Sequence, residues 1–154
     1  MKSDERRVEY VPLSKVLPAV SNPKEHDLGE ICVSIQRRGF VELPAIDGRT
    51  GRLVAGHGRI EALAKLKADK APIPAGLKET KGEWLVPVVR GWSSRNDADA
   101  ASYLVASNRL VEAGGWNEET LHLMLIDIAK DAPDELQGSG FDQQDVDKFI
   151  NEMN

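Results

Sequence analysis

The chain has 154 residues, of which 41% are hydrophobic and 29% charged, and its formal net charge is −5. This length is enough to bury one good core and too short for two large domains. Cys32 is the only cysteine, so no internal disulfide can form, and the three histidines (His26, His57 and His122) lack the spacing of metal ligands. We therefore expect no structural zinc site and assign no residue as a metal ligand.

The sequence shows neither a membrane span nor a secretion signal. It has no run of about eighteen apolar residues, and the opening Met-Lys-Ser-Asp-Glu-Arg-Arg is charged rather than apolar. We expect a cytoplasmic protein that does not contact a membrane.

Charge is divided unevenly along the chain. Residues 113–154 carry ten acidic residues against Lys130 and Lys148, a formal charge of −8, which leaves +3 for residues 1–112. A mildly basic body tolerates nucleotides or nucleic acid, whereas an acidic tail repels a DNA backbone and suits a basic protein partner. We therefore predict a globular domain over 1–112 and an acidic helical extension over 113–154 that packs on it.

The chain opens with a strand and a helix. Residues 8–13 have strand composition, and residues 14–18 are typical of one short helical turn. The segment 23–38 shows apolar residues at helical spacing, and Gly39 is a suitable C-cap. Cys32 lies on the apolar face of this helix, so we expect it to be a core residue rather than a reactive thiol.

A hairpin and a further strand follow. The short apolar runs 43–47 and 52–55 are separated by Asp-Gly-Arg-Thr-Gly, which predicts a hairpin. The stretch 69–82 has two prolines, two glycines and no period, and we interpret it as an exposed loop. Residues 84–89 are β-like, and Pro87 within them favours an edge position or a strand end.

Three helices complete the chain. Ser94 and Asp97 match a capping box that opens the first, and Asn117 and Asp142 are suitable N-caps for the other two. The residues that we expect to face inward are Ala101, Leu104, Val105, Leu121, Met124, Leu125, Ile128, Val146, Phe149, Ile150 and Met153. The order of elements predicts an α+β fold, in which a small mixed sheet packs with helices and a helical C-terminal extension follows.

The most informative segment is 53–59, Leu-Val-Ala-Gly-His-Gly-Arg, where an apolar strand meets two glycines as a helix begins that ends near Lys67. A helix N-terminus presents unpaired N–H groups and a partial positive charge, which suits a phosphate. Gly56 and Gly58 remove the Cβ atoms that would hold a ligand off the backbone, and Arg59 can bind phosphate oxygens. An ordinary strand-to-helix turn with a solvated arginine is the alternative, and both interpretations stay open.

Six segments occur in a characteristic order. They are Val11-Pro-Leu-Ser-Lys-Val with Ser21-Asn-Pro-Lys, Ser34-Ile-Gln-Arg-Arg-Gly-Phe, Val54-Ala-Gly-His-Gly-Arg-Ile-Glu-Ala-Leu, Val86-Pro-Val-Val, Ala106-Ser-Asn-Arg-Leu, and Gly115-Trp-Asn-Glu-Glu-Thr-Leu with Gly140-Phe-Asp. Together they resemble the ParB/sulfiredoxin fold, in particular the stand-alone ParB-like nuclease domains of phages, plasmids and DNA-methylase neighbourhoods. The resemblance covers roughly residues 8–150, and its specificity lies in the order of the six segments.

This resemblance implies that residues 1–112 form a nucleotide-binding domain that holds the phosphates of CTP or ATP, with Mg²⁺. Carried over by position, the phosphate cradle consists of Gly56, His57, Gly58 and Arg59, with Asn108 and Arg109 on the second side and Asn22 and Lys24 at the mouth. For the last four residues, an ordinary turn or surface role is the alternative. The resemblance also implies a phage- or plasmid-encoded protein of DNA metabolism in a bacterial host.

Two departures limit what the resemblance implies. Sulfiredoxins need a cysteine in the central segment, where this chain has His57, so reduction of a sulfinic acid is excluded. Partition-type ParB proteins have an arginine-rich central segment and a helix-turn-helix domain, whereas this chain has one arginine there and ends in an acidic tail. We therefore do not expect a site-specific partition clamp, and we expect only weak binding to DNA. The Walker sequence of P-loop enzymes is also missing.

Some relatives of this fold transfer phosphate, which requires a base and a cation. The acids and bases near the opening segment are Glu25, His26, Asp27 and Glu30, of which we take Glu25, His26 and Glu30 as catalytic candidates. An ordinary charged first helical turn is the alternative. We expect His57 to donate a hydrogen bond to the phosphate, more strongly when protonated.

Three functions follow from these features. The first is a nucleotide-binding, NTP-hydrolysing ParB-like domain. The second is a metal-dependent DNA nuclease that uses the acidic cluster, and the third is a non-enzymatic interaction module that uses the acidic extension. Exposed strands permit a homodimer without requiring one.

Overall fold

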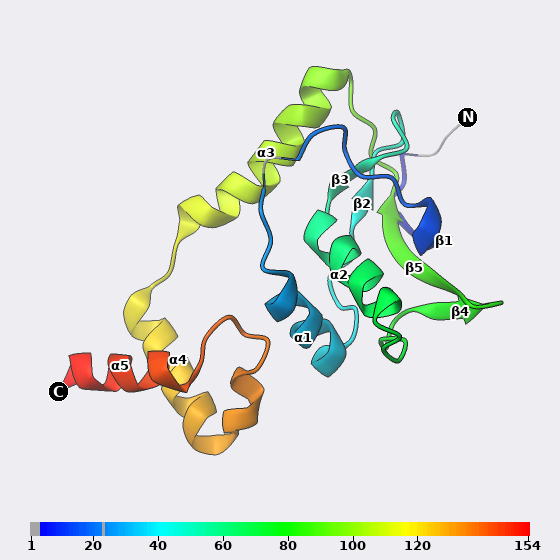
Figure 1. Ribbon diagram of the computed structural model, residues 1–154. Coiled ribbons are helices and arrows are strands. Elements are labelled where there is room, and N and C mark those ends of the chain that lie inside the picture. The colour runs from blue at the N-terminus through cyan, green and yellow to red at the C-terminus, as the bar shows by residue number, and fades with distance from the viewer. Residues whose placement is uncertain (1–3, 23) are drawn as a thin grey trace.

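The structure, a computed structural model, describes residues 4–22 and 24–154, and in it helices pack on a small mixed sheet (Figure 1). The elements are β1 (Arg7–Pro12), the 3₁₀ helix η1 (Leu13–Lys15), α1 (Leu28–Arg38), β2 (Ala45–Ile46), β3 (Leu53–Ala55), α2 (His57–Ala68), β4 (Lys78–Thr80), β5 (Glu83–Arg90), α3 (Asp97–Gly114), α4 (Glu118–Asp131), the 3₁₀ helix η2 (Pro133–Leu136) and α5 (Gln143–Met153). The predicted α+β class is confirmed. In the described part of the chain, no helix combines the length and apolarity that a membrane crossing needs.

Strand β5 is central in the sheet order β1-β5-β2-β3. Strand β4 pairs with the beginning of β5, and β2 pairs near the end of β5. The prediction that Pro87 marks an edge strand or a strand end is therefore wrong. Val89 N–H donates to Pro44 O at 2.8 Å on the β2 side, and because N–H directions alternate, the nitrogen of Pro87 faces the same side. The nitrogen of Pro87 lies in the gap between β4 and β2, where β5 pairs with neither strand and a backbone N–H would have no sheet partner. The stretch 69–82, which we expected to be a loop, contains β4.

Helices α1 and α2 lie on one face of the sheet and form the main core with it (Figure 1). Its most buried members are Leu53, Ala62, Leu63, Val86 and Val88. Cys32 belongs to this core, and burial raises the pKa of its thiol, so the predicted structural role is confirmed.

Helix α1 begins later than the sequence pattern predicts. Asp27 is its N-cap, since its carboxylate accepts a hydrogen bond from Glu30 N at 3.2 Å, so residues 24–27 are not helical and Pro23 lies outside the described residues. At the other end, Gly39 has φ +84° and is the predicted C-cap.

The long helix α3 leads from the sheet to the C-terminal extension, which forms its own small core around Leu125, Leu136 and Val146 (Figure 1). Of the residues expected to face inward from α3, only Leu104 is buried, whereas Val105 is 51% exposed. Ala101, Met124, Ile150 and Met153 are exposed as well, contrary to prediction, because the helices that carry them have few neighbours. The predicted boundary at residue 112 falls in the last turn of α3 and stays a prediction.

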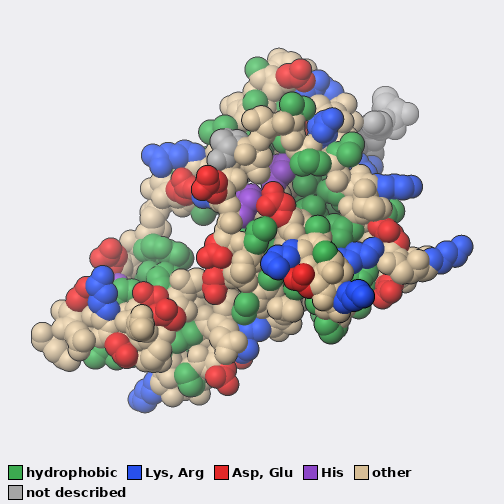
Figure 2. Space-filling view, viewed as in Figure 1, with side chains coloured by type: hydrophobic (Ala, Val, Ile, Leu, Met, Phe, Trp, Pro, Cys, Tyr) green, Lys and Arg blue, Asp and Glu red, His purple; other side chains and the backbone are tan. Residues whose placement is uncertain are grey.

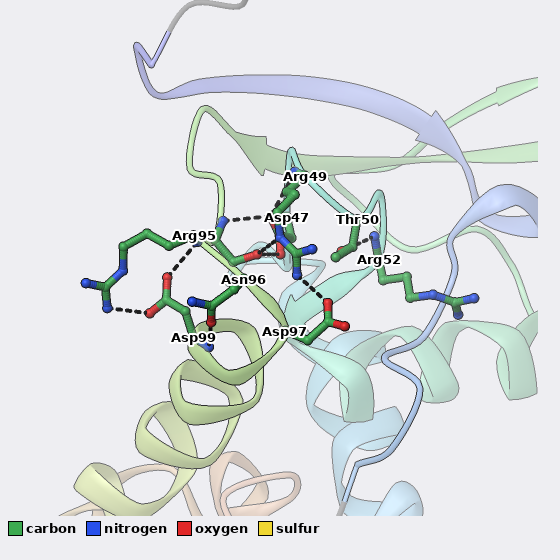
Figure 3. Close-up of polar contacts among 9 residues, drawn as sticks. Asp47, Arg49, Thr50, Arg52, Arg95, Asn96, Asp97 and Asp99 are labelled. Atoms are coloured by element: carbon green, nitrogen blue, oxygen red, sulfur yellow. Dashed lines mark hydrogen bonds and ion pairs between the residues drawn. The ribbon is translucent and has the colours of Figure 1, made fainter.

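A buried carboxylate joins the β2–β3 turn to the start of α3 (Figure 3). Asp47 is fully buried and accepts hydrogen bonds from Arg49 N at 2.9 Å, Ser94 N at 2.9 Å and Ser94 Oγ at 2.6 Å. Ser94 is therefore not the cap of α3, although its sequence pattern predicts that it is. Asn96 caps the helix, because its side chain accepts from Asp99 N at 2.8 Å.

We predict that Asp47→Asn lowers the free energy of unfolding by about 3 kcal/mol, because it leaves buried donors facing an amide N–H₂ group. Urea denaturation followed by circular dichroism measures the change. Asp97→Ala is the matched control, since it removes an exposed carboxylate that pairs with Arg49 in the first turn of α3 and should cost less than about 1 kcal/mol. Equal losses in the two variants would contradict the role assigned to Asp47.

The contribution of Asp47 should also depend on pH. Burial alone would raise the pKa of this carboxyl, but the hydrogen bonds from Ser94 and Arg49 outweigh burial and lower it below its ordinary value. A lowered carboxyl pKa stabilises the fold above the ordinary value of about 3.9, and the contribution disappears as pH falls through the folded-state pKa. The stability difference between the unaltered chain and Asp47→Asn should therefore be constant from about pH 5 to 7 and shrink below about pH 4. A difference that grew on acidification would contradict this assignment.

Candidate functional site

A cavity of about 390 Å³ opens at the N-terminus of α2. It is lined by Asn22, His26, Glu30, Ile31, Ser34, Ile35, Ala55, Gly56, His57, Gly58, Arg59, Ser107, Asn108, Gly138, Ser139 and Gly140. Its walls are therefore the opening segment, α1, the β3–α2 turn, α3 and a loop of the extension. The structure brings together eight candidate residues here, and Lys24, Glu25 and Arg109 lie outside the lining.

The two glycines of the β3–α2 turn are required by protein contacts. Gly56 has φ +91°, and a Cβ atom there would come within 2.6 Å of Pro44 Cβ. A Cβ atom on Gly58 would lie 2.7 Å from His26 Nδ1. These glycines therefore make room for a proline and an imidazole, and the expectation that they also let a ligand approach the backbone stays a prediction.

The same turn still presents free donors to the cavity. The first hydrogen bond within α2 runs from Ile60 N to Gly56 O at 3.1 Å, so the amides of His57, Gly58 and Arg59 precede it. These three residues line the cavity. The arrangement can hold an anion with backbone N–H groups and the positive end of the helix dipole.

His57 is buried, and its side chain is engaged by protein backbone. Its Nε2 accepts a hydrogen bond from Ala19 N at 3.0 Å, so Nε2 carries no proton. Burial lowers the pKa of His57, and the nearby His26 lowers it further. Nε2 of His57 thus fixes the segment before α1 over the β3–α2 turn, and a hydrogen bond from the other ring nitrogen to a phosphate stays a prediction.

Arg59 lies at the rim of the cavity and forms an ion pair with Glu42, with Nη2 and Oε2 2.7 Å apart. The side chains of Arg59 and Glu42 are 39% and 73% exposed. An exposed pair of this kind is worth about 0–1 kcal/mol, so a phosphate can compete for the guanidinium. Arg59 is also the one lysine or arginine among the lining residues.

The two uncharged amide candidates, Asn22 and Asn108, each contact a residue nearby in the sequence. Asn22 Nδ2 and His26 Nε2 lie 3.5 Å apart, and Asn108 Nδ2 donates to Leu104 O at 2.9 Å. Asn108 therefore keeps its side-chain carbonyl oxygen as the group that it can offer to a ligand.

The charged residues of the opening segment have separate roles. Lys24 pairs with Glu112 at the end of α3 and lowers the pKa of that carboxyl, so it connects two elements rather than lining the mouth. Asp27 caps α1, Glu25 is exposed, and Glu30 accepts a hydrogen bond from Gly140 N at 3.3 Å. In the part of the chain that the structure describes, no three His, Cys, Asp or Glu side chains converge on a site for a metal ion.

Sequence reasoning missed three parts of the site. Ser34 and Ser107 line the cavity from α1 and α3, and the loop Gly138–Gly140 closes it from the extension. The Gly-Ser-Gly sequence of this loop is the one local signal that could have indicated a close approach of backbone. Side chains on helix faces such as Ser34 gave no such signal.

One of the comparisons with known proteins supports the family that the resemblance implies. No protein-family model matches the chain. A curated relative, the ParB-like nuclease domain-containing protein YnaK of Escherichia coli (strain K12), is 31% identical over 74 residues, which are 46% of this chain and 84% of YnaK. With this identity over most of the relative's length and the α+β architecture described above, the chain belongs to the ParB-like nuclease domain family.

Proposed function

We propose that the chain binds a ribonucleoside triphosphate, CTP or ATP, in the cavity at the N-terminus of α2 and acts in phage or plasmid DNA metabolism. The observation that carries the proposal is the convergence of three N-terminal amides of α2 and Arg59 on one cavity in a member of this family. The volume of about 390 Å³ is within the usual range for small-molecule sites.

Magnesium would enter this site with the nucleotide. Mg²⁺ in nucleotide sites is bound by substrate phosphates, water and one or two carboxylates, so a dedicated cluster of protein ligands is not needed. Glu30, the one carboxylate in the lining, accepts a hydrogen bond from Gly140 N at 3.3 Å, so the phosphates and water would supply the ligands of the ion. The ion would neutralise charge on the phosphates.

Hydrolysis of the bound nucleotide is the next step of the proposal. His26 and Glu30 are the catalytic candidates that line the cavity, and Glu25 is not among the lining residues. His26 is half-buried against Gly58, beside the amides proposed to hold phosphate, so it is the better placed base for activating a water.

Metal-dependent DNA cleavage has less support. The carboxylates of Asp27 and Glu30 are engaged in a helix cap and a loop contact, respectively. Figure 2 shows the blue Lys and Arg side chains scattered among red acidic ones on this face of the molecule, rather than gathered in a stripe that could follow a DNA backbone.

We predict that Arg59→Ala weakens binding of CTP or ATP by about tenfold to a hundredfold, because a charge-assisted hydrogen bond of this kind is worth about 1.5–3 kcal/mol. Isothermal titration calorimetry with each of the four ribonucleoside triphosphates and MgCl₂ measures the affinity.

Glu42→Gln is the matched variant for this experiment. It removes the partner that Arg59 has in the structure and leaves the guanidinium free, so the affinity should stay the same or rise slightly. If Arg59→Ala binds as well as the unaltered chain, the phosphate does not contact Arg59. If the unaltered chain binds none of the four triphosphates, the proposed function is wrong.

A further inference from the structure

We propose that the loop Gly138–Gly140 of the C-terminal extension is part of this site, where it contacts the nucleoside while the N-terminus of α2 holds the phosphates. This inference rests on the nucleotide binding proposed above. The loop lines the same cavity as the β3–α2 turn, although the two segments lie far apart in the sequence. A site residue in the extension means that the predicted 1–112 domain does not contain the whole pocket.

Two arginines of α1, Arg37 and Arg38, anchor the loop to this helix. Arg38 donates from Nη1 to Gln137 O at 3.3 Å and from Nη2 to Glu135 O at 3.1 Å. Arg37 Nη2 lies 3.1 Å from Glu135 Oε1. These contacts fix the backbone that leads into the loop, so the loop has a defined position on the body of the protein.

Gly138 allows a close approach of the loop to α1 that a residue with a side chain would prevent. Gly138 has φ +78°, and a Cβ atom there would lie 2.8 Å from both N and Cα of Ser34. Gly140 donates its N–H to Glu30 Oε2 at 3.3 Å. Backbone of the extension is therefore packed directly on the α1 residues that line the cavity.

The loop and the residues just before it hold the extension against α1. Helices α4 and α5 pack around Leu125, Leu136 and Val146, and Figure 1 shows them apart from the sheet, with the chain between η2 and α5 returning to α1. The second half of α3 does not cover the extension, since Leu110 and Val111 are 71% and 78% exposed. Displacement of the loop would therefore open one wall of the cavity without unfolding either core.

The charges around the cavity determine the orientation of the ligand. Glu30 places a carboxylate beside the loop, whereas Arg59 and the amides of α2 lie in another wall. A triphosphate is repelled by the first and attracted by the second. The other residues that line the cavity beside the loop, among them Ser34 and Ser139, are neutral and suit the hydroxyls of a ribose or the edge of a base, whereas the guanidinium of Arg38 is bonded to the backbone that leads into the loop and is not part of the lining.

Gly138→Ala tests the inference, and Gly82→Ala is its matched control. Both glycines have φ +78°, but a Cβ atom on Gly82 meets open space, whereas one on Gly138 meets the backbone of Ser34. By calorimetry with MgCl₂, Gly138→Ala should bind CTP or ATP at least about tenfold more weakly, and Gly82→Ala within about twofold of the unaltered chain. Pyrophosphate, which lacks a nucleoside, should bind Gly138→Ala and the unaltered chain alike.

Hydrogen–deuterium exchange of the unaltered chain gives a second readout that no substitution can disturb. Saturating CTP or ATP should slow exchange in residues 135–141, and pyrophosphate should slow it only around the start of α2. Unchanged exchange in 135–141 on triphosphate binding, or full affinity in Gly138→Ala, would overturn the inference and leave the proposed function intact. Failure of the unaltered chain to bind any triphosphate would overturn both.

Discussion

The contact between Pro44 and Gly56 is the constraint on which the site depends. Gly56 follows β3 with φ +91°, and Pro44, just before β2, occupies the space in which any other residue would place its Cβ atom. The contact fixes the direction in which α2 leaves the sheet. Since α2 forms one side of the core and its N-terminus forms one wall of the cavity, one backbone approach positions both. Stability and the proposed binding thus depend on the same turn.

The two histidines beside this turn, His57 and His26, have different roles because their surroundings differ. His57 is buried and accepts a hydrogen bond from the backbone of Ala19, so its proton-binding capacity is used to hold the opening segment. His26 lies half-buried on Gly58 and faces the cavity. A residue within the glycine segment can therefore be structural, while one outside it faces the cavity. Proximity in space, rather than membership of the glycine segment, decides which of the two can reach a ligand.

Sequence patterns predicted the features that depend on neighbours along the chain. The C-cap at Gly39 and the N-cap at Asp142 were correct because the groups that they satisfy lie within the same helix turn. The prediction that Ser94 caps α3 was wrong because Asp47, distant in sequence, binds both the N–H and the hydroxyl of Ser94. The prediction for Pro87 was wrong because the gap that accommodates this proline depends on where β4 and β2 end. The family and half of the residues that line the cavity were predicted, largely because the resemblance supplied long-range information that periodicity does not contain.

The wall of the cavity at Gly138–Gly140 could not be predicted, because its position follows from how the extension docks on α1. The acidic composition of residues 113–154 suggests a separate binding module, yet Arg37 and Arg38 bind Glu135 and its neighbours within the same chain. Part of the basic charge of the body is thereby neutralised internally and is not available to a nucleic acid. The loop Gly138–Gly140 of the extension thus completes the lining of the cavity, whereas binding of a protein partner by the extension stays a prediction.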